Sequence, residues 1–219
     1  MGRIPKGSFR AIPYCKLGEK AYRARSMVGY YGSPLIKRRP SFKRAEIMMP
    51  SITERCRRLL STTRFITLAT ASAQGSPWAS TVNYVYRHKT ESLLWYSMSD
   101  SLHSKNIDRD PNISGSIFRT DFGASAPPVG LDGIQLSGLA RSVPDDEIEV
   151  IYEEYYRTNF PDELARAQWA LPLSDFKKIG KRSFYVLTVQ RLWLLDLERW
   201  AYDKNDQRIE VELPLPDAN

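Results

Sequence analysis

The chain has 219 residues, of which 42% are hydrophobic, so it is long enough for one folded domain with extensions or for two small domains. No apolar run approaches the roughly 18 residues of a membrane span, and the N-terminus lacks the apolar stretch of a secretory signal. Cys15 and Cys56 are too few for a disulfide framework or a zinc site, so we expect no metal and a reducing, cytoplasmic compartment.

The net charge of +7 belongs to the first part of the chain. Residues 1–50 contain twelve Lys or Arg and only two Glu, whereas the other residues contain 20 basic and 23 acidic side chains. Residues 1–47 show no helical or strand period, so we predict a disordered basic segment there and one folded domain over residues 48–219. The run Lys37-Arg38-Arg39 could contact nucleic acid or an anionic membrane, but we expect neither partner, because charge runs are usually solvated and no aromatic platform is organised around this one. Alternatively, translation starts at Met48 or Met49.

The first predicted element is a helix that extends to about Ser61. Ser51-Ile52-Thr53-Glu54 is a capping box, in which the serine caps the helix and the glutamate reaches back. The helical period places four residues on the inner face: Ile52, Cys56, Leu59 and Leu60. Cys56 is therefore interpreted as a core residue rather than a nucleophile. The period places Arg55, Arg57 and Arg58 on the solvent side.

Strands dominate the rest of the chain. They are predicted at residues 65–70, 78–86, 93–97, 113–118, 133–143, 184–190, 192–197 and 207–213. Residues 73–76 form a hairpin turn, residues 121–131 a mobile loop, and residues 145–158 and 161–169 two helices. Along residues 133–143 the apolar Ile134, Leu136 and Leu139 are expected to face the core. Short hairpins interrupted by helices favour an α+β fold with an antiparallel barrel.

The region after residues 93–97 is the first candidate site. Serines recur at every second position, at Ser97, Ser99 and Ser101, and Ser101 is a natural N-cap for a short helix over residues 102–108. His103 and Lys105 fall in the first turn of that helix. Unpaired backbone N–H groups, hydroxyls, an imidazole and an ammonium group together could hold a phosphate. A serine-capped turn without any ligand is the alternative.

The order of these parts is similar to that of the pyridoxamine 5′-phosphate oxidase-like split barrels, which bind FMN at a dimer interface. The segments that carry the resemblance are RFITLATASAQGSPWASTVNYVY, HSKNIDRDPNISGSIF and GIQLSGLARSV, within residues 51–143. The resemblance implies a split β-barrel flanked by helices, a homodimer with the flavin at its interface, and an FMN-dependent oxidoreductase that acts on a small molecule. FAD, a deazaflavin or haem remain alternatives to FMN.

The resemblance also implies which residues contact the cofactor. The flavin ring would lie against Ala79, Ser80, Thr81 and Val82, where small side chains let backbone groups reach the ring edge. The phosphate would be held by Ser97, Ser99, Ser101 and His103, with Lys105 as a nearby cation. Gln135 would approach the ring, and Trp200 could pack against it from the partner subunit. No catalytic residue is indicated.

Two features of the sequence depart from the family's pattern. Pyridoxamine phosphate oxidases have an arginine-rich second strand and a C-terminal Arg/Pro motif, and neither occurs in PWASTVNYVY or LERWAYDKNDQ. We therefore expect a substrate other than pyridoxamine phosphate. Two alternative functions stay open, a non-catalytic flavin-binding protein and a haem-binding or haem-degrading split barrel. The second would need a histidine ligand, and only His88, in a charged turn, and His103 exist.

Overall fold

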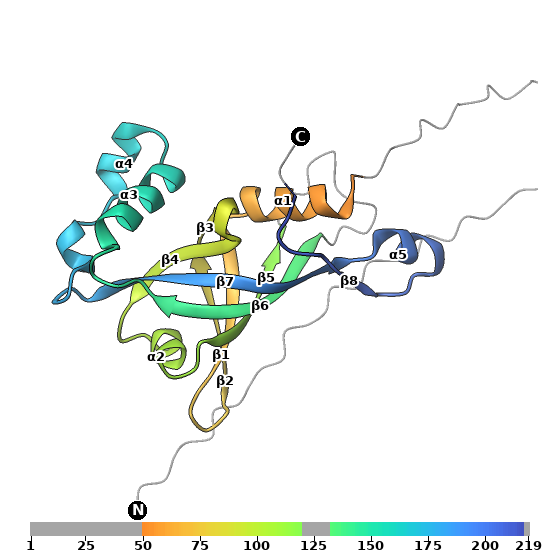
Figure 1. Cartoon of the computed structure of the whole chain (residues 1–219), viewed down its shortest axis with the longest axis horizontal. Helices are drawn as coiled ribbons and strands as arrows, with labels where there is room; N and C mark the ends of the chain where they lie inside the picture. The colour runs from red at the N-terminus through yellow and green to blue at the C-terminus, as the bar shows by residue number, and fades with distance from the viewer. Residues whose placement is uncertain (1–49, 120–131, 217–219) are drawn as a thin grey trace, which may run out of the picture. The chain divides into compact units, whose positions relative to one another are not determined.

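The computed structural model of the chain describes residues 50–119 and 132–216 (Figure 1). The predicted basic segment 1–47 and the whole predicted loop 121–131 lie outside the described residues. The helices are α1 (Ile52–Thr62), α2 (Leu102–Arg109), α3 (Ile148–Asn159), α4 (Glu163–Trp169) and α5 (Leu197–Asp203). The strands are β1 (Phe65–Ala71), β2 (Pro77–Asn83), β3 (Val85–Arg87), β4 (Ser92–Met98), β5 (Asn112–Phe118), β6 (Gly133–Ser142), β7 (Arg182–Leu195) and β8 (Arg208–Glu210).

All strands belong to one antiparallel sheet with the order β2-β1-β5-β6-β7-β4-β3, and β8 pairs with β7. The two end strands, β2 and β3, are consecutive in the chain and separated only by Tyr84. Because the chain passes from one edge of the sheet to the other at Tyr84, the sheet must curl into a barrel. The predicted α+β split barrel is confirmed. Figure 1 shows α1 near one end of the curled sheet and α2 near the other.

The predicted second strand, residues 78–86, is divided at Tyr84. The Tyr84 side chain is buried, and its hydroxyl donates a hydrogen bond to the Leu60 carbonyl at 2.9 Å. Its backbone N–H donates to the carbonyl of Arg64 at 3.0 Å. Tyr84 therefore fixes the bend between β2 and β3 against α1 and the start of β1.

The barrel interior is filled by alternating side chains of the strands. In β1 and β5 every second residue is buried, and a Cβ atom on Gly115 would lie 2.6 Å from Cδ1 of Ile66. Residue 115 therefore has no room for a larger side chain, because Ile66 fills the space beside it. Leu139, expected inside, is 39% exposed because the inner face of β6 continues through Gly138 and Ala140.

The last third of the chain differs most from the prediction. The two strands predicted at 184–190 and 192–197 form one strand, β7, which ends at Leu195. Ser137 of β6 lies opposite Arg191 and Gly138 lies opposite Val189, so only Gln190 is left without a partner in β6 and the pairing continues on both sides of it. Residues 197–203 form α5 instead of continuing a strand, and the carboxylate of Asp196 caps it by accepting from Arg199 N–H at 2.8 Å. The predicted last strand, residues 207–213, is reduced to β8.

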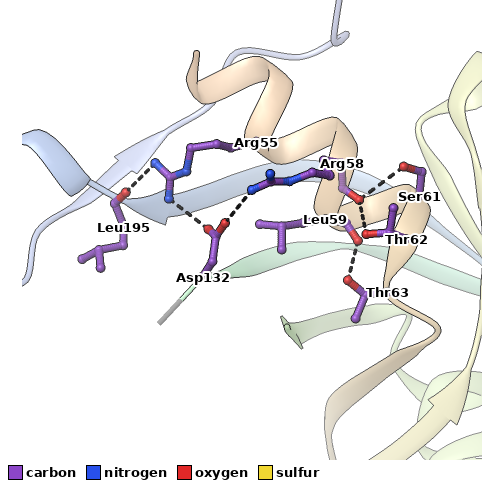
Figure 2. Close-up of polar contacts among 8 residues, drawn as sticks. All are labelled: Arg55, Arg58, Leu59, Ser61, Thr62, Thr63, Asp132 and Leu195. Atoms are coloured by element: carbon purple, nitrogen blue, oxygen red, sulfur yellow. Dashed lines mark hydrogen bonds and ion pairs between the residues drawn. The ribbon is translucent and has the colours of Figure 1, made fainter. Parts of the chain in front are cut away.

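The prediction for Arg55 was wrong. Its side chain is buried, and Nη2 donates to Oδ1 of Asp132 at 3.0 Å while Nη1 donates to the Leu195 carbonyl at 3.2 Å (Figure 2). The second carboxylate oxygen of Asp132 accepts from Nη2 of Arg58 at 3.3 Å. Arg55 lies inside because a buried carboxylate, directly before β6, neutralises its charge. The pair thus ties α1 to β6 and β7.

Two kinds of feature are absent from the part of the chain that the structure describes. None of its helices combines the length and the hydrophobicity that crossing a membrane requires. It also contains no group of three or more His, Cys, Asp or Glu side chains placed to hold a metal ion.

Candidate functional site

The barrel wall is open between β2 and the second half of β4. Among the described strands, β2 pairs only with β1, and β3 pairs only with residues 92–94 of β4. Residues 95–98 of β4 therefore pair with β7 alone, although β2 lies close to β4. Both edges leave backbone N–H and C=O groups without a strand partner. We call this opening, bounded by residues 77–83 and 95–98, the split.

The four residues predicted to lie against a flavin ring form the middle of β2. Ala79 and Thr81 are exposed on the outer face, where the Thr81 hydroxyl lies 3.1 Å from that of Thr67. Ser80 is half-buried and accepts a hydrogen bond from Nε1 of Trp78 at 2.8 Å, whereas Val82 is buried in the barrel core. Three of the four side chains are small, so the unpaired backbone edge of β2 is accessible to a ligand.

The predicted phosphate-binding residues form a polar cluster at the other edge of the split. Nε2 of His103 lies 2.8 Å from the Ser97 hydroxyl, and Nδ1 lies 3.3 Å from the Ser101 hydroxyl. Ser101 caps α2, as predicted, and also donates to Oγ of Ser104 at 2.9 Å. Further hydroxyls extend the cluster, since those of Ser99 and Ser183 are 2.9 Å apart. We call these six residues, namely Ser97, Ser99, Ser101, His103, Ser104 and Ser183, the hydroxyl cluster.

The imidazole of His103 is the titratable group of the hydroxyl cluster. Burial lowers the pKa of His103 below its ordinary value, so the ring is neutral at pH 7. A neutral ring can donate from one nitrogen and accept at the other, which suits the two serine hydroxyls beside it. A phosphate dianion bound to the ring would stabilise the protonated form and raise the pKa again.

The structure does not bring Lys105 into the hydroxyl cluster. Lys105 is exposed, and residues two positions apart on a helix do not face the same side, so its ammonium group lies away from His103. The charge near the cluster is therefore smaller than the sequence suggested. The neutral hydroxyl and imidazole groups are its main hydrogen-bonding groups.

Buried hydrogen bonds connect α2, which carries part of the hydroxyl cluster, to β1 and β2 at the split. Nδ2 of Asn106, which is buried in α2, donates to the Thr70 hydroxyl at 3.0 Å. The Thr70 hydroxyl in turn reaches the carbonyl of Trp78 at 3.5 Å. Because Thr70 belongs to β1 and Trp78 to β2, these contacts fix the middle of α2 beside the first half of β2.

Gln135 lies on another part of the surface. It lines a groove of about 660 Å³ on the outer face of the barrel, together with Thr67, Trp193 and Arg208. Gln135, Ser116, Thr67 and Thr81 lie opposite one another on four neighbouring strands. Three strand spacings of about 4.8 Å separate Gln135 from Thr81 by about 14 Å. Within one copy of the chain, Gln135 therefore does not reach the split.

The remaining two candidates lie outside the split as well. His88 is exposed in the short 3₁₀ helix His88–Thr90, as its charged surroundings predicted. Trp200 is half-buried in α5, where the ammonium group of Lys204 lies 4.2 Å from the centre of its ring. Sequence reasoning missed Ser183, which joins the hydroxyl cluster from β7. No local pattern marks it, since only the pairing of Ser183 with Ser97 brings it there.

Comparison with known proteins gives a family and a shared fold. The family model described as pyridoxamine 5′-phosphate oxidase matches residues 52–196. A haem-binding protein from Mycobacterium smegmatis is 22% identical with a TM-score of 0.54, and the match covers 75% of this chain and 59% of that one. Campylobacter jejuni ChuZ is 15% identical with a TM-score of 0.54 and coverages of 74% and 59%. An FAD-binding protein from Mesorhizobium loti is 17% identical with a TM-score of 0.48 and coverages of 65% and 92%.

These matches set the scale of the comparison. The chain spans about three-fifths of the length of the first two structures, and at these identities the likeness is one of fold. A search of the curated proteins finds no match.

Proposed function

The chain belongs to the pyridoxamine 5′-phosphate oxidase family, and on that basis we propose that it is an FMN-binding oxidoreductase. Its substrate would be a small molecule other than pyridoxamine phosphate. One observation carries the proposal. The accessible backbone edge of β2 and the hydroxyl cluster at the start of α2 line the same opening of the barrel, as a ligand with a flat ring and a phosphate requires.

The residues present fit both ends of such a ligand. The hydroxyls of Ser97 and Ser101, the ring of His103 and the backbone N–H groups of the first turn of α2 would bind the phosphate. The small, exposed Ala79 and the outward Thr81 would leave the backbone of β2 free to bond the ring edge. When bound, the flavin would supply hydride or electron transfer.

We propose that a second copy of the chain completes the site. Gln135 is about 14 Å from Thr81, by three strand spacings, so it can contact the same ring only from a partner subunit. The outer face of β5 and β6 also exposes Phe118 by 43% and Leu139 by 39%, apolar surface that a dimer would bury. Size-exclusion chromatography with light scattering should show a dimer, and a monomer at micromolar concentration would contradict this part of the proposal.

A haem-binding protein is the second candidate. The fold shared with the haem-binding protein from M. smegmatis favours it, and His103 offers a neutral imidazole that could ligate iron. To do so, Nε2 of His103 would have to leave the Ser97 hydroxyl. Haem binding does not require the hydroxyl cluster, whereas FMN binding uses it to hold the phosphate. We therefore prefer FMN binding to haem binding.

Absorbance spectra separate the two candidates. The protein titrated with FMN should show flavin bands near about 370 and 450 nm and should quench flavin fluorescence. The same protein titrated with hemin should show no sharp Soret band. A Soret band that disappears in the His103→Gln variant, together with no FMN binding, would instead establish the haem function.

A further inference from the structure

A second pocket lies where the end of β2 meets α3 and α4. It has a volume of about 360 Å³, within the range of small-molecule sites. Five of its lining residues are aromatic: Phe65, Tyr96, Tyr155, Phe160 and Trp169. The other two are Arg64 and Asn83. Neither the hydroxyl cluster nor the groove around Gln135 shares any of these residues.

The inner wall of this aromatic pocket is rigid. The ring of Tyr96 packs edge-to-face against the rings of Tyr155, at 5.3 Å, and Phe176, at 5.4 Å. The Tyr155 hydroxyl donates to Oδ1 of Asn83 at 3.0 Å, and Nδ2 of Asn83 donates to the Arg64 carbonyl at 2.9 Å. The Tyr155 hydroxyl and the Asn83 amide are thus already paired with each other or with the backbone, and the faces of the wall are those of aromatic rings.

The rim of the pocket consists of aromatic side chains that the fold leaves in water. Phe65 is 57% exposed on β1, and Trp169 is 63% exposed at the end of α4. Large rings of this kind usually bury most of their surface. A flat ring that stacked on them would remove that surface from water, whereas a saturated ring of the same size would pack less closely.

Arg64 gives the pocket a positive charge. Its Nη2 atom donates to Oδ1 of Asn159 at 3.3 Å, and its guanidinium carbon lies 6.0 Å from the centre of the Phe160 ring. Both partners are neutral. Within residues 50–119 and 132–216, no carboxylate forms an ion pair with Arg64. The guanidinium can therefore bind a carboxylate by donating two parallel hydrogen bonds to its oxygens.

We propose that the aromatic pocket binds a planar aromatic acid, with its ring on Phe65 and Trp169 and its carboxylate on Arg64. The position of the pocket also suggests a role for this ligand. Phe65 and Asn83 are opposite one another, two residues along the strands from the pair Thr67 and Thr81. The pocket thus begins about 7 Å from Thr81. If the flavin lies on β2, a step that rests on the proposed function, aromatic acids are the class of substrate bound beside it.

Calorimetric titration of the full chain with 2-naphthoate, without flavin, tests the pocket itself. We expect saturable binding that is at least tenfold weaker for the neutral 2-naphthalenemethanol and for the saturated decahydro-2-naphthoate. The variants Arg64→Gln and Trp169→Ala should each weaken 2-naphthoate binding at least tenfold, while Trp169→Phe keeps a ring and should bind nearly as well. All three changes are at exposed residues, so the melting temperature should stay constant. The matched control is Arg157→Gln, an exposed arginine of α3 outside the pocket, which should not change the affinity.

Two results would overturn the pocket assignment: no binding at millimolar 2-naphthoate, or equal affinities in the wild type, Arg64→Gln and Trp169→Ala. The link to the flavin is tested separately with FMN-saturated protein. There 2-naphthoate should perturb the flavin absorbance in the wild type but not in Trp169→Ala, and binding without any perturbation would overturn the substrate assignment. A chain that binds 2-naphthoate but not FMN would contradict the proposed function alone and leave the aromatic-acid site standing.

Discussion

Replacing Asp132 by asparagine measures how much the barrel depends on its buried ion pair (Figure 2). The Asp132 side chain is 1% exposed and its partner Arg55 is 6% exposed. Asparagine preserves the shape but removes the charge, which leaves the Arg55 guanidinium buried with only the carbonyl of Leu195 and a neutral amide. Removing one partner of a buried pair costs about 3–5 kcal/mol. Arg58, whose side chain is 43% exposed, should contribute only about 0–1 kcal/mol.

Urea denaturation checks these magnitudes. Asp132→Asn should lower the free energy of unfolding by about 3–5 kcal/mol, and at about 2–4 °C per kcal/mol the melting temperature should fall by roughly 6–20 °C. The control Arg58→Gln should lose no more than about 1 kcal/mol. The double variant Asp132→Asn with Arg55→Met should recover much of the loss because the unpaired charge is gone. Equal destabilisation by Asp132→Asn and Arg58→Gln would refute the reasoning.

Four further predictions concern the site and the fold. FMN affinity, followed by fluorescence titration, should be lower at high pH than at low pH because a bound phosphate favours protonated His103, and His103→Gln should remove this dependence. In the FMN-free protein the lowered pKa of His103 means that the unfolded state binds more protons, so thermal stability should drop below about pH 6.5 in the wild type but less in His103→Gln. Gly138→Ala should lower the melting temperature far more than Gly75→Ala. A Cβ atom on residue 138 would overlap the Thr188 carbonyl, whereas residue 75 has free space around it, and an alanine at its φ of +78° should lower the free energy of unfolding by only about 1–2 kcal/mol. Deleting residues 1–47 should leave melting temperature and FMN content unchanged, because the capping box of α1 follows that segment.

Local chemistry explains which parts of the fold the sequence predicts well. The capping box at Ser51 and the serine cap at Ser101 involve residues within three positions of each other, and both occur as expected. The turn before β2 follows from Gly75, which adopts a positive φ. The hydroxyl cluster was predictable to the same extent, because Ser97, Ser101 and His103 lie within seven residues of one another.

The errors arise from contacts between distant segments. Arg55 was placed in solvent because nothing near it in sequence indicates the buried Asp132. The strand β7 was divided because one extra residue, Gln190, interrupts the alternation of its side chains. Gln135 shows the same limit at the site, since its separation from the split follows from the order of four strands and not from any motif. The pocket around Arg64 combines residues from five elements and neighbouring turns, so the sequence gives no sign of it.

The dissociation constants of FMN and riboflavin for the double variant Ser101→Ala with His103→Ala test the central claim most directly. If the hydroxyl cluster holds the phosphate, each of the two lost hydrogen bonds to a charged group is worth about 1.5–3 kcal/mol, so FMN should bind about a hundredfold more weakly or weaker still. Riboflavin, which lacks the phosphate, should bind as before, and the stability of the unliganded protein should fall only by the lost cap, about 1 kcal/mol. An unchanged dissociation constant for FMN in a destabilised protein would contradict the account.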